Sequence, residues 1–484
     1  MMRVLIARCN AVDWRKVLGL RTWARRRAGL GLLLLGLLVL GACERTPPTG
    51  GQPPTLRSAP VPQGVVPVRV QKTAQGFRLL RGGRRCWLRG GGGLQQFGQL
   101  RAAGGNSIRL WSADYAGPLL DNAHRHGLTV MLGLWLEAED EQFSYYDPAL
   151  VRAQRERVRQ QVLRYRRHPA LLMWNVGNEL EYSATGPRVF EAVNEIARMI
   201  HALDPYHPVT ISVSLGNDFV KRAAQLQQIA PAVDILSINT YGELSQLPGR
   251  LRASGWRGAY IMTEYGNQGY WESDSTTWGA PQEQTSAAKA SFMRTGYREI
   301  IEPDSNRCLG SYAFFWGSKF EYTPTWFSLF EPTGEKTEMV DELHWLWGRR
   351  YPANRAPHLT GLRLAGRSAA DNVRLQAGRS YPAAVTVTDP EGDSLTVRWE
   401  IMPEMRVGSS IAEMMVPLEP VPGPVVVRQR GRQARVRMPA QPGAYRLYVR
   451  VFDGQGSVAT ANIPMLVVGE QPALLPFAVA FPGH

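Results

Sequence analysis

The chain has 484 residues, of which 44% are hydrophobic and 20% are charged. This composition excludes a largely disordered chain, and the presence of a single long apolar run excludes a polytopic membrane protein. The net charge of +15 does not indicate nucleic-acid binding, because residues 1–42 contribute +7 of it and the remaining basic residues are spread along the chain.

The first 42 residues have the pattern of a lipoprotein signal peptide. Three arginines at 25–27 precede a 15-residue apolar run at 28–42, which is short for a transmembrane helix and matches a signal-peptide core. The run ends in Leu-Gly-Ala-Cys at 40–43, which resembles the lipidation site of bacterial lipoproteins. The resemblance implies that Cys43 carries a lipid and tethers the protein to the cell envelope, at the outer membrane or periplasmic face in a Gram-negative cell. An uncleaved N-terminal anchor is the alternative.

Residues 43–62 are rich in Pro and Gly and lack periodicity, so we expect a tether. Of the four cysteines, Cys9 falls in the signal peptide and Cys43 takes the lipid, which leaves Cys86 and Cys308. In an oxidising compartment these two either form a disulfide or stay as separately buried thiols. No cysteine spacing indicates a metal site, and we expect none.

We expect residues 63–352 to form a parallel (β/α)8 barrel preceded by a short β segment. Strand-length apolar runs alternate with helical patterns, and the eight runs are WLRGG (87–91), SIRLW (107–111), LTVMLGLWL (128–136), ALLMWNVGNE (170–179), PVTISVS (208–214), ILSINTY (235–241), AYIMTEYG (259–266) and CLGSYAFFWG (308–317). The clearest helix is predicted over 149–166, between Asp147-Pro148 and His168-Pro169. A doubly wound open sheet is the alternative, but the glycines at 90–93 lack the order of a phosphate-binding loop.

Residues 353–472 change to a period of two and predict an immunoglobulin-like β-sandwich, followed by a C-terminal tail at 473–484. The pattern resembles bacterial modules of the cadherin or polycystic-kidney-disease-repeat type. One turn carries three acidic residues, Asp389, Glu391 and Asp393, which in such a module could bind calcium. The preferred interpretation is a polar β-turn.

Polar and aromatic residues end several predicted barrel strands, which is where active sites of these barrels lie. Glu179 and Glu264 end the fourth and seventh strands, which face each other across a barrel mouth. A retaining glycosidase needs such a pair, since one carboxyl protonates the leaving oxygen while the other attacks the anomeric carbon. Aromatic rings stack on sugar faces, and Arg and Asn side chains bind hydroxyl groups. The strand-end candidates for substrate binding are Arg109, Trp111, Trp135, Asn178, Asn239, Tyr241 and Trp316.

The sequences WNVGNE at 174–179 and TEYG at 263–266 resemble the catalytic barrel of glycoside hydrolase family 2. The resemblance covers about residues 75–350 and implies that Glu179 is the acid/base and Glu264 the nucleophile. No metal or organic cofactor is implied. The resemblance also implies roles for an Asn beside the acid/base, an Arg on strand two, a Tyr on strand six and a Trp on strand eight, here Asn178, Arg109, Tyr241 and Trp316.

Three departures from family 2 limit what the resemblance implies. The 42 residues between Cys43 and Cys86 are too few for the β-sandwich domains that usually precede that barrel. The sequence WSAD at 111–114 stands where the family often has a His after strand two, and the module after the barrel is unlike the usual ones. The family's known sugar specificities therefore do not transfer.

The sequence thus predicts a retaining glycoside hydrolase that acts on β-linked oligo- or polysaccharides at the cell envelope by double displacement. Fungal cell-wall glucanosyltransferases share the two-glutamate barrel, so a transglycosylase is an alternative. A non-catalytic lipoprotein that binds envelope polysaccharide is a second alternative, disfavoured because both carboxylates are present. The sequence does not indicate the oligomeric state.

Overall fold

The structure, a computed structural model, describes residues 61–182, 186–406 and 408–469. The predicted signal peptide, Cys43, nearly all of the predicted tether and the predicted tail at 473–484 lie outside these residues. Among the residues that are described, no helix has the length and apolar character needed to cross a membrane.

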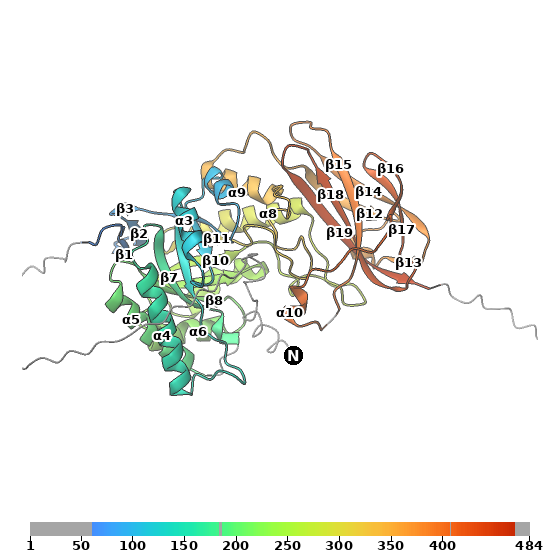
Figure 1. The fold of residues 1–484 in the computed structure, drawn as a ribbon. Helices are drawn as coiled ribbons and strands as arrows, with labels where there is room; N and C mark the ends of the chain where they lie inside the picture. Colours follow the sequence, from blue (N-terminus) through green and yellow to red (C-terminus); the bar gives the residue numbers. More distant parts are fainter. Residues whose placement is uncertain (1–60, 183–185, 407, 470–484) are drawn as a thin grey trace, which may run out of the picture.

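Eight parallel strands close into a barrel in the order β10-β11-β4-β5-β6-β7-β8-β9, so the predicted barrel is confirmed and the open sheet is wrong (Figure 1). Each predicted apolar run supplies one strand, because a strand covered by helices on one face and core on the other is apolar throughout. The strands are β4 (Leu88–Gly92), β5 (Ser107–Leu110), β6 (Thr129–Leu134), β7 (Leu171–Asn178), β8 (Val209–Ser214), β9 (Ile235–Thr240), β10 (Ala259–Tyr265) and β11 (Cys308–Ala313).

Helices surround the barrel between the strands. The predicted helix over 149–166 is confirmed as α4 (Pro148–Tyr165), and it begins where expected because the Asp147 carboxylate accepts from the backbone N–H groups of Ala149 and Leu150. The other barrel helices are α2 (Phe97–Ala102), α3 (Gly117–Arg125), α5 (Arg188–Leu203), α6 (Phe219–Ile229), α7 (Leu247–Ala253), α8 (Ser286–Gly296) and α9 (Glu338–Gly348). Short helical turns are η3 (Leu180–Tyr182), η4 (Gly242–Gln246) and η5 (Tyr297–Ile301).

A small antiparallel sheet covers the N-terminal end of the barrel, away from the sandwich (Figure 1). It consists of β1 (Val68–Thr73), β2 (Gly76–Arg81) and β3 (Arg84–Arg85). Buried Val68 and Leu79 of this sheet share a core cluster with barrel-interior residues such as Met131 and Ile261. The sheet therefore closes the end of the barrel opposite the strand ends that carry the predicted site.

The two cysteines of the barrel are free, so the disulfide alternative is wrong. Cys308 is fully buried, and its thiol donates to the backbone oxygen of Gly310 at 3.4 Å. Burial raises the pKa of Cys308 to about 12 and also raises that of half-buried Cys86. Both thiols thus stay protonated, as separately packed side chains near the closed end of the barrel.

The C-terminal part is a sandwich of two four-stranded sheets, which confirms the predicted β-sandwich. Alternate residues such as Val385, Ile401, Leu447 and Ile463 point between the sheets and form a separate core. One sheet contains β12 (His358–Leu364), β14 (Ser380–Thr388), β17 (Gln433–Arg437) and β16 (Val426–Arg430), and the other contains β13 (Arg374–Gln376), β19 (Val458–Val468), β18 (Gly443–Phe452) and β15 (Thr396–Pro403). Two further turns are η6 (Ala369–Asp371) and α10 (Ile411–Met414).

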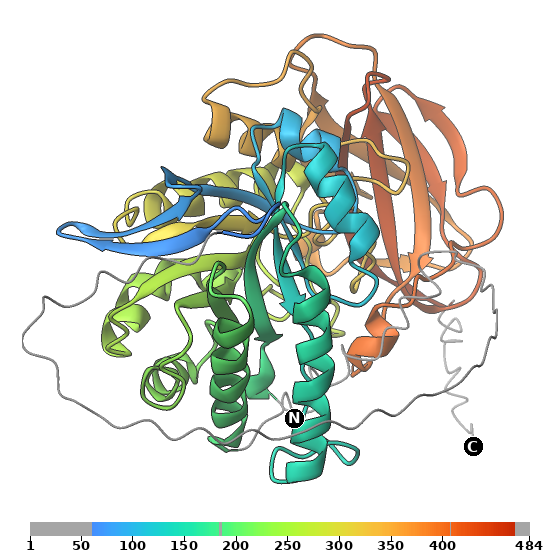
Figure 2. The same ribbon diagram turned by 60° about the vertical axis from the view of Figure 1, so that its left-hand side comes forward.

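The sandwich packs along one side of the barrel, with β18 and β19 nearest to it (Figure 2). Four charged residues with buried side chains meet at this contact, and we call them the interdomain charge cluster: Glu283, Lys289, Glu404 and Arg446. The Lys289 ammonium lies 2.5 Å from Glu283, and the Arg446 guanidinium lies 3.0 Å from Glu404. Arg446 also donates to the backbone oxygen of Pro281 in the barrel. Removal of the sandwich would expose these charges, so barrel and sandwich form one packed unit.

Candidate active site

The end of β7 has an irregular backbone that orients Glu179. Gly177 has φ 78° and Glu179 has φ 52°, and the pairing with β8 shifts register between Asn175 and Asn178. The positive φ of position 177 would strain any other residue, and a Cβ there would lie 2.6 Å from the Leu180 side chain, so glycine suits this position of the WNVGNE sequence. A non-glycine residue with positive φ at a strand end is the kind of strain found at functional sites.

Glu264, at the end of β10, is buried and accepts three hydrogen bonds. The guanidinium of Arg109 donates to Oε1 at 2.6 Å, and the indole of Trp111 donates to the same oxygen at 3.0 Å. The hydroxyl of Tyr241 donates to Oε2 at 2.7 Å. Three donors on one carboxylate, one of them a cation, stabilise its negative charge and fix its orientation.

Two asparagines connect Glu264 to Glu179. Asn239 donates to Glu179 Oε1 at 2.9 Å and to Asn178 Oδ1 at 3.1 Å. The same oxygen of Asn178 accepts from Arg109 at 2.5 Å. One continuous hydrogen-bond network from β5, β7, β9 and β10 therefore holds both glutamates, as Arg109 bonds to Asn178 and Glu264 together.

The two glutamates have different electrostatic environments. The pKa of Glu179 is raised to about 8, first by burial and then by the negative charges of Glu264 and Glu181. Burial also raises the pKa of Glu181 to about 7. The pKa of the Tyr241 hydroxyl is raised well above its usual value by burial and by Glu264, so the hydroxyl keeps its proton and remains a donor. The raised pKa favours the protonated form of Glu179, which is the form that a catalytic acid requires.

Seven of the predicted residues thus form one network, which includes both glutamates: Arg109, Trp111, Asn178, Glu179, Asn239, Tyr241 and Glu264. Trp135 follows β6 and is partly exposed, but none of these hydrogen bonds includes it.

The expectation that Trp316 binds sugar is wrong. Its side chain has no exposed surface, its indole donates to the backbone oxygen of Gln96, and its ring packs on Phe330 and Trp347. Gly91 lies directly against this ring, where a Cβ would be 2.6 Å from it. The tryptophan turns back over β4 and serves packing, which a strand-end position in the sequence does not reveal.

Sequence reasoning missed Glu181, a third carboxylate beside the pair. Glu181 Oε1 accepts from the backbone N–H of Ser214 at 2.6 Å, which ties the turn after β7 to the end of β8. Its neighbour Tyr182 donates to the Ser214 hydroxyl. Its position two residues after Glu179 was the available indication in the sequence. The alternation of a strand does not predict where the Glu181 side chain lies, because the strand ends before Glu179.

The acidic turn of the sandwich is arranged differently from the predicted trio. Asp389 and Asp393 lie near Asp453, with carboxylate oxygens within 4.8 Å of one another, while Glu391 pairs with Arg355 at 3.0 Å. Asp389 Oδ1 accepts from the backbone N–H groups of Glu391 and Asp393. These backbone hydrogen bonds are what the polar-turn interpretation predicts.

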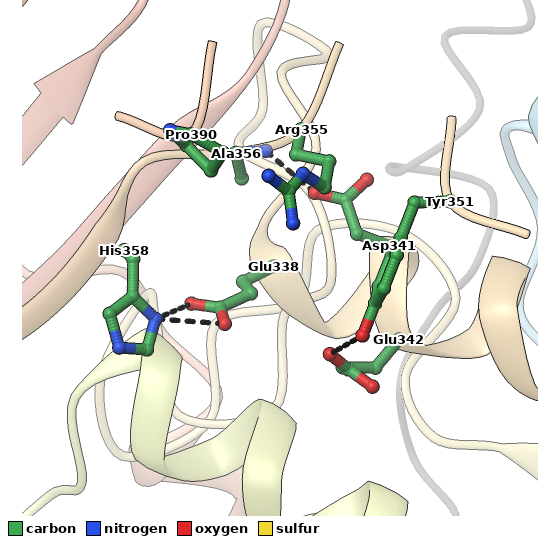
Figure 3. A pocket seen from close by; sticks show the side chains of 8 residues that line it. All are labelled: Glu338, Asp341, Glu342, Tyr351, Arg355, Ala356, His358 and Pro390. Atoms are coloured by element: carbon green, nitrogen blue, oxygen red, sulfur yellow. Dashed lines mark hydrogen bonds and ion pairs between the residues drawn. The ribbon is translucent and has the colours of Figure 1, made fainter. Parts of the chain in front are cut away.

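A cavity of about 100 Å³ lies outside the barrel mouth, where α9 meets the start of the sandwich (Figure 3). Its charged groups pair with one another or with neighbours: His358 contacts Glu338 at 3.0 Å, and the Tyr351 hydroxyl donates to Glu342 at 2.7 Å (Figure 3). Asp341 contacts Lys336 and accepts from the backbone N–H of Ala356. These pairs stabilise the connection between the two parts of the molecule, and neither Glu179 nor Glu264 lines the cavity.

Comparison with known proteins gives a match for the barrel. Residues 98–273 match the family described as glycosyl hydrolases family 2, TIM barrel domain. The β-glucuronidase of Pongo abelii is 29% identical over 191 residues, which are 36% of this chain and 27% of that protein. The β-glucuronidase of Rattus norvegicus is 29% identical over 153 residues, 31% of this chain and 21% of that protein.

Among solved structures, the β-D-glucuronidase of Dictyoglomus thermophilum aligns with a TM-score of 0.46 and 18% identity, over 59% of this chain and 54% of that one. The β-glucuronidase of Bacteroides uniformis aligns with a TM-score of 0.45 and 14% identity, over 83% of this chain and 48% of that one.

The family match confirms the resemblance to a family 2 catalytic barrel over the stretch that contains Arg109, Glu179, Tyr241 and Glu264. The match with the two β-glucuronidases named first spans only about a quarter of their length.

Proposed function

We propose that the protein is a retaining glycoside hydrolase that acts on β-linked glycans with Glu264 as nucleophile and Glu179 as acid/base. The observation that carries the proposal is the network in which Arg109 and two asparagines connect the two glutamates, while burial and like charge favour the protonated form of Glu179. The family match of the barrel and the β-glucuronidase relatives support the same reaction class.

In the first step, Glu264 forms a bond to the anomeric carbon while the bond from that carbon to the glycosidic oxygen breaks. Glu179 transfers its proton to the leaving oxygen. In the second step, Glu179, now ionised, takes a proton from a water molecule, which attacks the anomeric carbon and releases Glu264. Two inversions at the same carbon retain the β configuration.

The test is the activity of purified residues 44–484 on a panel of aryl β-glycosides and β-glucans. We expect the enzyme to release at least one sugar first as its β-anomer. Proton NMR during early turnover detects which anomer is released. Release of the α-anomer first would contradict double displacement. Formation of longer oligosaccharides at high substrate concentration would identify the transglycosylase alternative, in which a sugar hydroxyl replaces water. Binding to a glucan without turnover would identify the non-catalytic alternative.

We further propose that the enzyme works at the cell envelope, held by a lipid on Cys43. The support is the apolar run that ends in Leu-Gly-Ala-Cys at 40–43. Cys43→Ser should move the protein from the membrane fraction to the soluble fraction while its activity per molecule stays the same. Retention of the variant in the membrane would favour an uncleaved anchor.

A further inference from the structure

Trp271 is an exposed aromatic side chain near the proposed nucleophile. It lies on the loop between β10 and α8, and 49% of its surface is exposed. The other strongly exposed large hydrophobic side chains of the described residues are tyrosines and valines. An exposed indole does not contribute the free energy that its burial would supply. The contacts of Trp271 therefore indicate whether the ring has a binding role.

The loop that carries Trp271 is held rigidly. The Glu272 carboxylate accepts from the backbone N–H of Gly242 at 2.7 Å and from that of Gly269 at 2.8 Å. The Gln268 side chain donates to the backbone oxygen of Glu272 at 2.5 Å, and the Trp326 indole donates to that of Gln268 at 3.0 Å. Hydrogen bonds on both sides of Trp271 therefore fix an exposed ring in place, which is how a binding surface avoids an entropic cost on association.

The ring of Trp271 also packs on the aromatic groups around the nucleophile. Its centroid lies 5.4 Å from that of Tyr241, at 89°, and 4.8 Å from that of Tyr270, at 85°. Tyr241 donates to Glu264, so the ring of Tyr241 is the one group between Trp271 and the proposed nucleophile in this chain of contacts. These edge contacts support the indole at one side and leave about half of it open.

The sandwich supports the same surface from behind. Tyr270 stacks on Tyr322 with centroids 5.1 Å apart, and the backbone N–H of Tyr322 donates to the backbone oxygen of Met414 in α10 at 3.0 Å. Met405 and Met414 belong to one buried cluster with Tyr241 and Tyr322. The packed sandwich thus holds the loop of Trp271 against the barrel mouth.

We propose that Trp271 is a stacking platform for the sugar residue adjoining the one that Glu264 attacks, which makes a β-linked oligosaccharide, rather than a single glycoside, the preferred substrate. This inference rests on the proposed function. A β-linked glucose unit presents flat C–H faces to an aromatic ring while its equatorial hydroxyls stay at the edge. A rigid, half-exposed indole beside a polar catalytic network fits such a ligand better than a wholly apolar one.

The experiment compares Trp271→Leu, which keeps an apolar side chain but removes the ring, with Trp271→Phe, which keeps a ring. Substrates are β-glucosyl fluoride, with one sugar and a single-atom leaving group, and glucotetraoses with β-1,3 or β-1,4 linkages. For Trp271→Leu we expect the loss of kcat/KM on the better tetraose to exceed the loss on the fluoride by about tenfold, through a higher KM. Trp271→Phe should retain most of the kcat/KM that Trp271→Leu loses on the tetraose. Tyr115→Leu is the control, an exposed aromatic residue on the loop after β5 that is 57% exposed.

Equal losses on the two substrates, or an equal effect of Tyr115→Leu, would overturn the proposal. Binding of the tetraoses to Glu264→Gln, with and without Trp271→Leu, is measured by calorimetry and separates the two hypotheses. If the native chain hydrolyses neither these substrates nor any member of the panel of aryl β-glycosides and β-glucans, the proposed function fails, and a tenfold weaker tetraose affinity in the double variant would still support the platform. If the native chain hydrolyses the fluoride and neither tetraose binds to Glu264→Gln, the platform is wrong and the proposed function stands.

Discussion

Two clusters of buried charge differ in their balance. At the barrel mouth, the carboxylates Glu179, Glu181 and Glu264 gather near the guanidinium of Arg109. In the interdomain charge cluster, two carboxylates face two cations, with Lys289 on Glu283 and Arg446 on Glu404. The mouth has a surplus of negative charge, whereas the interdomain cluster has equal numbers of both signs.

Burial and neighbouring charges act differently on individual carboxylates, and in the interdomain charge cluster burial still raises the pKa of Glu404 beside Arg446. Burial would raise the pKa of Glu283, but Lys289 and Arg446 outweigh it and the pKa is lowered. At the mouth, burial and two like charges act in the same direction, and the pKa of Glu179 rises to about 8. The surplus of negative charge at the mouth therefore favours a protonated Glu179 at neutral pH, which is the form that acid catalysis needs.

The largest expected effect is that of Glu264→Gln, which removes the charge on which the network at the mouth converges. We expect kcat to fall about 10³-fold or more on every substrate, because the variant lacks the carboxylate that forms the glycosyl-enzyme bond. The measurement is steady-state kinetics, with thermal unfolding as the control for folding. Activity near that of the native chain would remove Glu264 from the mechanism.

Glu179→Gln tests whether Glu179 donates the proton to the leaving oxygen. On glycosides with poor leaving groups we expect a loss of about 10²–10⁴-fold in kcat/KM, since the leaving oxygen then departs without a proton. Activated aryl glycosides and the fluoride need little protonation and should lose much less in the first step. Equal losses for good and poor leaving groups would show that Glu179 is not the acid.

Lys289→Met tests the balanced cluster, because it leaves Glu283 buried without its cation. We expect a loss of about 3–5 kcal/mol in the free energy of unfolding, measured with denaturant. The double variant Glu283→Gln with Lys289→Met should lose less than the single one. The control is Arg155→Met, which breaks an exposed ion pair with Glu195 and should cost at most about 1 kcal/mol. If Lys289→Met costs no more than the control, the cluster does not hold the sandwich on the barrel.

The smallest effect concerns pH. A carboxyl whose pKa is raised carries its proton below that pKa, so kcat/KM for poor leaving groups should fall as pH rises through about 8, where Glu179 loses its proton. Glu181→Gln removes a like charge, lowers the pKa of Glu179 and should shift this alkaline limb to lower pH. An alkaline limb at the same or a higher pH in the variant would mean that the charge of Glu181 does not raise the pKa of Glu179.

Strand and helix positions in the barrel were readable because they depend on local patterns. Eight apolar runs of strand length and the Asp147-Pro148 cap indicate the alternation directly. The residues at strand ends, such as Glu179, Glu264 and Tyr241, follow from that alternation, since all carboxyl ends of parallel strands meet at one mouth. The prediction for Trp316 was wrong because a strand-end residue can turn either into the mouth or back over the barrel. The choice depends on Gly91, which lies on the neighbouring strand β4 but more than 200 residues away in the sequence.

What the sequence determined by itself was the order of elements, the two-part architecture and the pair of carboxylates, because period and strand ends are written locally in the chain. The tertiary structure alone decided which charged groups lie close enough to affect one another. It placed Glu181 beside Glu179, set Lys289 against Glu283, and brought the sandwich behind Trp271. These contacts join residues far apart in sequence or across a bend, and their energies depend on burial, which no local pattern specifies.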